Sequence, residues 1–178
     1  MANRIHSALL IAAIVALVSV LGVTGAADKS AADKAEKFTV TGTVYCDVCR
    51  AKFVTRVSER MPAAKVRLEC HNITDGKFTY GVDGETDANG VYHIEADGDH
   101  EDEYCGIKPV KSSKEDCSEI IKDGWAKEFT RVALTTKNGM VSRTRNVNPI
   151  LYLKAKPIAV CAEVFKELHY VPGEDLHP

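Results

Sequence analysis

The chain has 178 residues, with 23 Lys+Arg against 25 Asp+Glu and a formal net charge of −2. Charges of both signs are interspersed, so the sequence lacks the basic excess on one face that nucleic-acid binding requires. It also lacks a polybasic stretch that would suit a membrane surface. We therefore expect neither nucleic-acid nor membrane partners for the mature chain.

A secretory signal peptide is predicted at the N-terminus. Arg4 precedes a nearly uninterrupted apolar run from Ala8 to Val23, and small residues follow this run. The run is about 16 residues long, which is short of the ~20 that a spanning helix needs, so cleavage is favoured over an uncleaved membrane anchor. We expect secretion to the extracellular space and this organisation: signal peptide 1–27, disordered leader 28–37, one domain 38–170 and a loose tail 171–178.

Strands are predicted where apolar and polar residues alternate or where β-branched residues gather. The seven segments are 38–45, 65–71, 78–82, 91–95, 105–110, 129–134 and 150–153. Asp87–Gly90 and Asn138–Gly139 are turn signals, and the second is typical of a hairpin, because Asn and Gly tolerate positive φ. Pro109 favours an edge position for its strand.

Two segments contain apolar residues at helical spacing. Residues 51–60 fit a helix or an extended segment, and Pro62 ends either one. Cys161–Leu168 is predicted to be a short C-terminal helix. With about seven short strands and little helix, the expected fold is all-β, a small disulfide-stapled sandwich or open barrel of antiparallel strands.

All six cysteines follow the predicted signal peptide. An even number of cysteines in an exported chain indicates a disulfide framework. A zinc site at Cys46-x-x-Cys49 would need a second ligand pair, which is missing. A redox-active pair would usually open a helix, whereas this one ends a strand-like run. Structural disulfides are therefore favoured, with 15 pairings open, among Cys46, Cys49, Cys70, Cys105, Cys117 and Cys161.

The sequence contains no catalytic motif such as G-x-S-x-G or H-E-x-x-H. We expect no enzyme activity, no cofactor and no metal. The acidic run Asp97–Glu103 raises calcium as an alternative, but its spacing does not match an EF-hand loop, so a solvated charge run is favoured. The sequon Asn72-Ile73-Thr74 is a candidate N-glycan acceptor in a secreted chain.

A set of motifs then suggests a known family. They occur in the order Gly42-x-Val44-Tyr45-Cys46-Asp47-x-Cys49-Arg50, Val66-x-Leu68-x-Cys70, Cys105, Asp116-Cys117-x-Glu119-Ile120, Gly124-Trp125-Ala126-Lys127, Val147-Asn148-Pro149 and Cys161-Ala162. In these motifs the chain resembles the Ole e I-like pollen protein family over roughly residues 38–168. The pollen allergens of that family commonly carry a late-hairpin sequon, which Asn138-Gly139-Met140 lacks.

The resemblance implies a disulfide pairing and a function. The family pattern would pair Cys46 with Cys117, Cys49 with Cys161, and Cys70 with Cys105. It implies a β-barrel or sandwich and a secreted, non-enzymatic extracellular protein of the pollen-tube growth, hydration or signalling type. It also implies a receptor-kinase ectodomain as partner and potential allergenicity. The alternative is a cell-wall glycan-binding module that would use exposed aromatic residues, for which the candidates are Tyr80, Tyr92, Tyr104 and Trp125.

Overall fold

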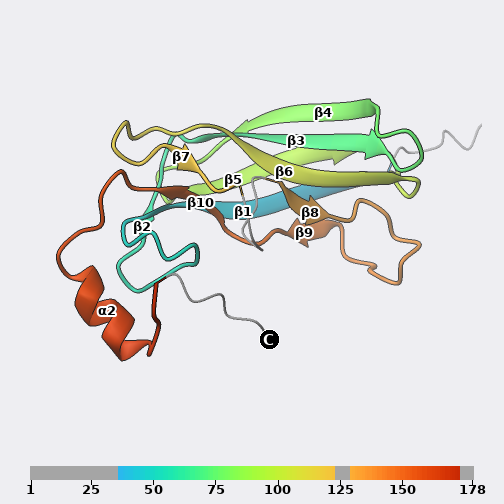
Figure 1. Cartoon of the computed structure of the whole chain (residues 1–178). Coiled ribbons are helices and arrows are strands. Elements are labelled where there is room, and N and C mark those ends of the chain that lie inside the picture. The colour runs from blue at the N-terminus through green and yellow to red at the C-terminus, as the bar shows by residue number, and fades with distance from the viewer. Residues whose placement is uncertain (1–35, 123–128, 173–178) are drawn as a thin grey trace, which may run out of the picture. The chain divides into compact units, whose positions relative to one another are not determined.

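The structure is a computed structural model that describes residues 36–122 and 129–172. Trp125, a candidate glycan contact, lies outside the described residues, as do the predicted signal peptide and most of the predicted leader and tail. Two sheets and one short helix make up the described part of the chain (Figure 1). The expected all-β class with a short C-terminal helix is confirmed.

The first sheet is organised around the long strand β1 (Lys37–Asp47), which begins one residue before its predicted start. Its first half pairs with β5 (Val91–Asp97) on one side and with β9 (Thr144–Asn146) on the other. Its second half pairs with β2 (Glu59–Arg60) and β10 (Ile150–Leu153). β7 (Glu119–Ile120) extends the sheet beyond β10.

The second sheet has the strand order β4-β3-β6-β8. Its members are β3 (Lys65–Asn72), β4 (Phe78–Glu85), β6 (Glu103–Lys111) and β8 (Thr130–Val132). All three pairs in this sheet are antiparallel. β4 leads into β5 of the first sheet through the predicted turn at Asp87–Gly90, where Gly90 has φ +74°. The chain therefore passes from one sheet to the other at this turn.

The core lies between the two sheets and follows the predicted alternation. In β3 the side chains of Val66, Leu68 and Cys70 are fully buried, while their neighbours are half-buried or exposed. β1, β5 and β10 supply the facing layer, because one face of each strand carries apolar residues. That layer contains Phe38, Val40, Val44, Tyr92, Ile94, Ala96, Ile150 and Tyr152.

Three expectations about the strands are wrong in detail. β9 and β10 run parallel to β1, so the first sheet is mixed. The turn at Asn138–Gly139 forms, with φ +84° at Gly139, but it does not close a hairpin, because β8 pairs with β6 and β9 with β1. β6 is a central strand, and it tolerates Pro109 because its pairing with β8 stops at Ile107.

The ambiguous segment at residues 51–60 forms neither a helix nor a long strand. It is irregular, and only Glu59 and Arg60 pair with β1. The helix α2 (Cys161–Glu167) matches the C-terminal prediction and buries Cys161 and Val164. Among the described residues, no helix has the length and apolar character needed to cross a membrane.

Candidate functional site

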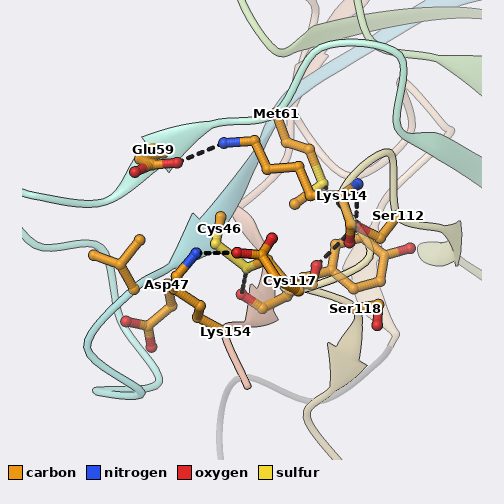
Figure 2. The surroundings of a disulfide bond; sticks show 12 residues. Cys46, Asp47, Glu59, Met61, Ser112, Lys114, Cys117, Ser118 and Lys154 are labelled. Carbon is orange, nitrogen blue, oxygen red and sulfur yellow. Dashed lines mark hydrogen bonds and ion pairs between the residues drawn. A yellow bond between two sulfur atoms is a disulfide. The ribbon is translucent and has the colours of Figure 1, made fainter. Parts of the chain in front are cut away.

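The disulfide Cys46–Cys117 joins the end of β1 to the loop before β7. In Figure 2, Ser112, Lys114 and Ser118 gather beside Cys117. The hydroxyl of Ser112 donates to the carbonyl of Cys117 at 2.7 Å and accepts from the backbone N–H of Lys114 at 3.0 Å. The Lys114 ammonium forms an ion pair with Glu59. Through these side-chain contacts the loop before β7 is held to itself and to β2, so this corner has a structural role.

Asp47, which lies between Cys46 and Cys49, stabilises the turn that follows β1. Its side chain is buried, and its carboxylate accepts hydrogen bonds from the backbone N–H groups of Cys49 at 3.1 Å and Lys52 at 2.7 Å. Burial raises the pKa of this carboxyl group, although the backbone hydrogen bonds oppose the shift. Asp47 thus holds the turn in which Cys49 lies in position to bond to Cys161.

The structure contains three disulfides, Cys46–Cys117, Cys49–Cys161 and Cys70–Cys105. These are the pairs that the family resemblance implies. Cys49–Cys161 ties the start of α2 to the turn after β1, and Cys70–Cys105 joins directly opposed residues of β3 and β6. The described residues contain no free cysteine, so a thiolate is not available there as a nucleophile or a metal ligand.

One group of side chains has the composition of a metal site. Ligand atoms of Cys70, His100, Glu103 and Cys105 lie within 4.8 Å of one another. The two sulfur atoms are bonded to each other, however, and the imidazole Nδ1 of His100 lies 2.6 Å from a carboxylate oxygen of Glu103. Zinc sites use three or four protein ligands, with thiolates rather than disulfides. In its oxidised form this group therefore supports the sheet and does not match a metal site.

Three segments that are distant in sequence meet at one end of the sandwich. They are residues 72–77, which run from the last residue of β3 to β4, residues 98–102, which follow β5, and residues 133–143, which follow β8 (Figure 1). The N–H of Ile73 donates to the carbonyl of Asp102 at 3.3 Å, and the N–H of His100 donates to the carbonyl of Leu134 at 2.9 Å. We call these three segments the loop end.

Basic side chains compensate much of the acidic run Asp97–Glu103, whose middle part lies in the loop end. The Lys137 ammonium lies 2.5 Å from a carboxylate oxygen of Glu101 and 3.2 Å from one of Asp99. Asp97 forms an ion pair with Lys37, and the carboxylate of Glu103 is hydrogen-bonded to the imidazole of His100. Its carboxylates are thus shared among separate basic partners and do not converge on one point, as the oxygen ligands of a Ca²⁺ site do.

Arg145 supports the third segment of the loop end from inside the protein. Its side chain is buried, with a residue exposure of 2 %, and its guanidinium carbon lies 4.8 Å from the ring centre of Phe38. The guanidinium donates to backbone carbonyls from both sides of the turn at Asn138–Gly139. These carbonyls belong to Ala133, Thr135, Met140 and Ser142. Sequence reasoning missed this residue, since nothing in the local pattern distinguishes it from Arg143.

Apolar side chains are exposed on the loop end. Val141 is 85 % exposed, and Ile73 and Met140 are also exposed. Asn72 lies beside Ile73, and its side-chain oxygen accepts from the N–H groups of Thr74 and Asp75 at 2.8 and 3.2 Å. The Asn72 amide nitrogen has no hydrogen-bond partner among the described residues. The loop end therefore combines an apolar surface with a sequon at its edge.

The predicted aromatic candidates separate in the structure. Tyr92 is fully buried, and burial raises the pKa of its hydroxyl group. It is therefore a core residue and is removed from the predicted glycan contacts. Tyr80 is half-buried and packs against His100 with ring centres 4.7 Å apart. Tyr104 lies on the outer face of the second sheet, in a row of rings whose other members the sequence did not identify.

Comparisons with known proteins agree with this fold. Residues 36–169 match the family described as "Pollen protein Ole e 1 like". The chain is 46% identical to an Olee1-like protein of Betula pendula over 138 residues, covering 78% of this chain and 83% of the relative. It is 47% identical to pollen allergen Sal k 5.0101 of Kali turgidum over 136 residues, covering 75% and 90%. The crystal structure of the plantain pollen allergen Pla l 1 superposes with a TM-score of 0.62 at 40% identity, covering 68% of this chain and 97% of that one.

Proposed function

Because the chain belongs to the Ole e 1-like family of pollen proteins, we propose that it is a secreted, non-enzymatic protein that binds an extracellular protein partner through its loop end. Relatives named as pollen allergens or pollen-specific proteins support a role in pollen. The same names support the expectation that the protein is an allergen. The apolar run from Ala8 to Val23 supports export, and the disulfides suit an oxidising compartment.

The observation that carries the proposal is the convergence of three loops on one surface. A rigid β scaffold that presents adjacent loops is a common basis for recognition. Here the scaffold is stapled by disulfides, and the buried guanidinium of Arg145 holds one of the three loops. Exposed Ile73, Met140 and Val141 supply apolar contact area next to paired charges, which is the composition expected of an interface core with a polar rim.

A receptor-kinase ectodomain is the partner class that we propose. The test is binding of the purified mature protein to a panel of such ectodomains, measured by biolayer interferometry. Val141→Asp puts a charge in place of the most exposed apolar side chain of the loop end and should raise Kd by about tenfold or more, which corresponds to ~1.4 kcal/mol. Val110→Asp is the matched control, because Val110 is 51 % exposed at the opposite end of β6, where it leaves the loop end unchanged.

Two results would count against this function. One is the absence of saturable binding to any ectodomain at micromolar concentration. The other is an equal loss of binding in both valine variants, which would place the contact elsewhere or indicate a general effect of the added charge. Near-UV circular dichroism of each variant establishes that the fold is intact before binding is measured.

We also propose that Asn72 carries an N-linked glycan. The free amide nitrogen and the exposed neighbours Ile73 and Thr74 make the sequon accessible to the glycosylation machinery. Enzymatic removal of N-glycans from protein expressed in plant cells should lower its mass, and Asn72→Gln should abolish that difference. An unchanged mass in the native protein would refute this site.

A further inference from the structure

The outer face of the sheet β4-β3-β6-β8 presents an ordered grid of side chains. Register places Phe78, His71 and Tyr104 opposite one another on three neighbouring strands. The next outward row contains Gly81, Glu69, Gly106 and Arg131, and the row after it contains Asp83, Arg67 and Lys108. The face therefore carries an aromatic row, a row with two glycines and a charged row.

The aromatic row is closely packed. The rings of His71 and Tyr104 are stacked with centres 5.2 Å apart and an interplanar angle of 13°. Phe78 meets the imidazole edge-on at 5.9 Å, and Phe129, just before β8, meets Tyr104 edge-on at 6.1 Å. The row thus spans four consecutive strand positions and exposes Phe78 at one end.

Two glycines make room for the outer rings of this row. A Cβ atom on Gly106 would lie 2.4 Å from a ring atom of Phe129, and one on Gly81 would lie 3.0 Å from the ring of Phe78. The same Cβ position lies only 2.7 Å from the backbone carbonyl oxygen of Thr130. Any larger residue at position 106 would therefore displace the ring of Phe129, because the rigid backbone on the same side leaves no other room. The sheet is therefore shaped to let aromatic rings lie over its surface.

The acidic side chains on this face all pair with basic ones, and two cations remain without an acidic partner among the described residues: Lys111, which lies opposite Lys65 at the far end of β6, and Arg131. Lys65 pairs with Glu85, Arg67 with Asp83, and Lys108 with Glu69, which also contacts Arg67 and His71. These contacts account for every acidic group of the grid. Arg131 is exposed and forms no ion pair with any residue that the structure describes.

Arg131 lies in a shallow pocket next to the aromatic row. The pocket has a volume of ≈ 290 Å³, and its lining includes Tyr104, Arg131 and Glu103. The carboxylate of Glu103 is already bound to His100 at 2.6 Å. The pocket therefore offers a ligand one ring face, one phenol hydroxyl and one guanidinium.

We propose that this face binds an acidic oligosaccharide built from uronate units. A uronate ring has an apolar face that can lie on an aromatic side chain and a single carboxylate that a guanidinium binds through two parallel hydrogen bonds. Tyr104, which lines the pocket, forms the stacking platform, and Arg131 binds the carboxylate. Phe78 adds exposed apolar surface at the other end of the row, where the guanidinium carbon of Arg67 lies 5.9 Å from its ring centre. The site adjoins the loop end, because its pocket includes Ala133, but it lies on the outer face of the sheet and does not depend on the proposed protein partner.

The test is isothermal titration calorimetry of the full mature protein with oligogalacturonides. The same oligomers in methyl-esterified form and a neutral gluco-oligosaccharide serve as comparison ligands. Arg131→Gln should weaken binding of the acidic oligomer by about tenfold without changing the weak binding of the ester. Tyr104→Ala should weaken both ligands. Arg60→Gln, an exposed arginine on β2, is the matched control and should bind as the unmodified protein does.

Each result of this titration either supports the site or overturns it. Loss of acidic-oligomer binding in Arg131→Gln, with binding retained in Arg60→Gln, supports the site. No saturable binding of the acidic oligomer at millimolar concentration overturns it, as does binding that Arg131→Gln leaves unchanged. Loss of ectodomain binding in Arg131→Gln would assign this face to a protein partner and would also overturn the proposal. Because Arg131 is exposed, its variant remains informative even if Tyr104→Ala fails to fold.

Discussion

Replacing Arg145 tests whether a buried cation holds the loop end together. Its guanidinium donates to the carbonyls of Ala133, Thr135 and Met140 at 2.8, 2.6 and 3.1 Å, and also to that of Ser142. Each hydrogen bond to a charged group contributes about 1.5–3 kcal/mol, so four bonds set an upper limit of roughly 6–12 kcal/mol. The cost of burying the guanidinium, several kcal/mol, opposes this gain.

The net effect should therefore be well below that limit. We expect Arg145→Ala to lower the free energy of unfolding by about 3–5 kcal/mol, as when other buried charge networks lose one partner. Arg145→Lys keeps the charge, but an ammonium has three donors at one point and cannot reach acceptors on both sides of the turn. We expect this variant to lose about 3 kcal/mol, the lower end of the roughly 3–6 kcal/mol that two charged hydrogen bonds contribute at about 1.5–3 kcal/mol each.

Urea unfolding followed by far-UV circular dichroism measures these changes. Limited proteolysis should additionally show faster cleavage within residues 135–143 in both Arg145 variants, because the loop loses its internal support. Arg143→Lys is the matched control, since the Arg143 side chain is 51 % exposed and pairs with Glu36 at the surface. It should stay within about 0.5 kcal/mol of the unmodified protein. An Arg145→Lys variant as stable as that control would refute the reasoning.

Three other predictions concern the disulfides, the carboxylate of Glu69 and the glycine at position 106. Removing Cys49–Cys161 by a double serine substitution should cost at most ~4.8 kcal/mol and removing Cys70–Cys105 at most ~3.8 kcal/mol, because the closed loops span 112 and 35 residues; the opposite order of melting temperatures would contradict the loop-closure account. Burial opposes ionisation of Glu69, but the hydrogen bond with Lys108 and the charges around it outweigh this effect and lower its pKa from 4.5. The stability that Glu69 contributes is therefore present above pH 4.5 and is lost as the pH falls through the lowered folded-state pKa. Glu69→Gln should flatten the acid limb of the plot of stability against pH. An unchanged acid limb would contradict the ion-pair assignment. Gly106→Ala should shift the near-UV circular dichroism of the aromatic row and destabilise the fold by about 1–3 kcal/mol, since the added methyl group overlaps the ring of Phe129; unchanged spectra and stability would show that the ring does not lie over Gly106.

Much of the fold was predictable because its signals are local. Alternation in Lys65–Asn72 identifies which side chains face the core, since successive residues of a strand point to opposite faces. Asn and Gly at Asp87–Gly90 predict a turn, because Gly90 adopts a positive φ. The helix at Cys161–Glu167 was predicted for the same kind of reason, as its apolar residues repeat at helical spacing.

Pairing partners could not be predicted in the same way. The signal at Asn138–Gly139 describes a turn, but it does not determine whether the flanking strands pair with each other. Here β8 and β9 join different sheets. Pro109 likewise carries no information on how far a neighbouring strand extends, so a central strand was mistaken for an edge. Strand pairing depends on residues far apart in sequence, which a local pattern does not include.

The sequence by itself determined the all-β class, the core faces of the main strands, the number of cysteines available for pairing and, through its motifs, the family. Only the tertiary structure decided which charged and aromatic side chains contact one another. Both Arg143 and Arg145 place their guanidinium carbons near the ring of Phe38, at 5.5 and 4.8 Å from its centre, but only Arg145 is buried there, because β9 runs beside β1. His71, Phe78, Tyr104 and Phe129 form one row because the register of separate strands aligns them. Both arrangements arise from contacts between distant segments, and such contacts exist only in the folded chain.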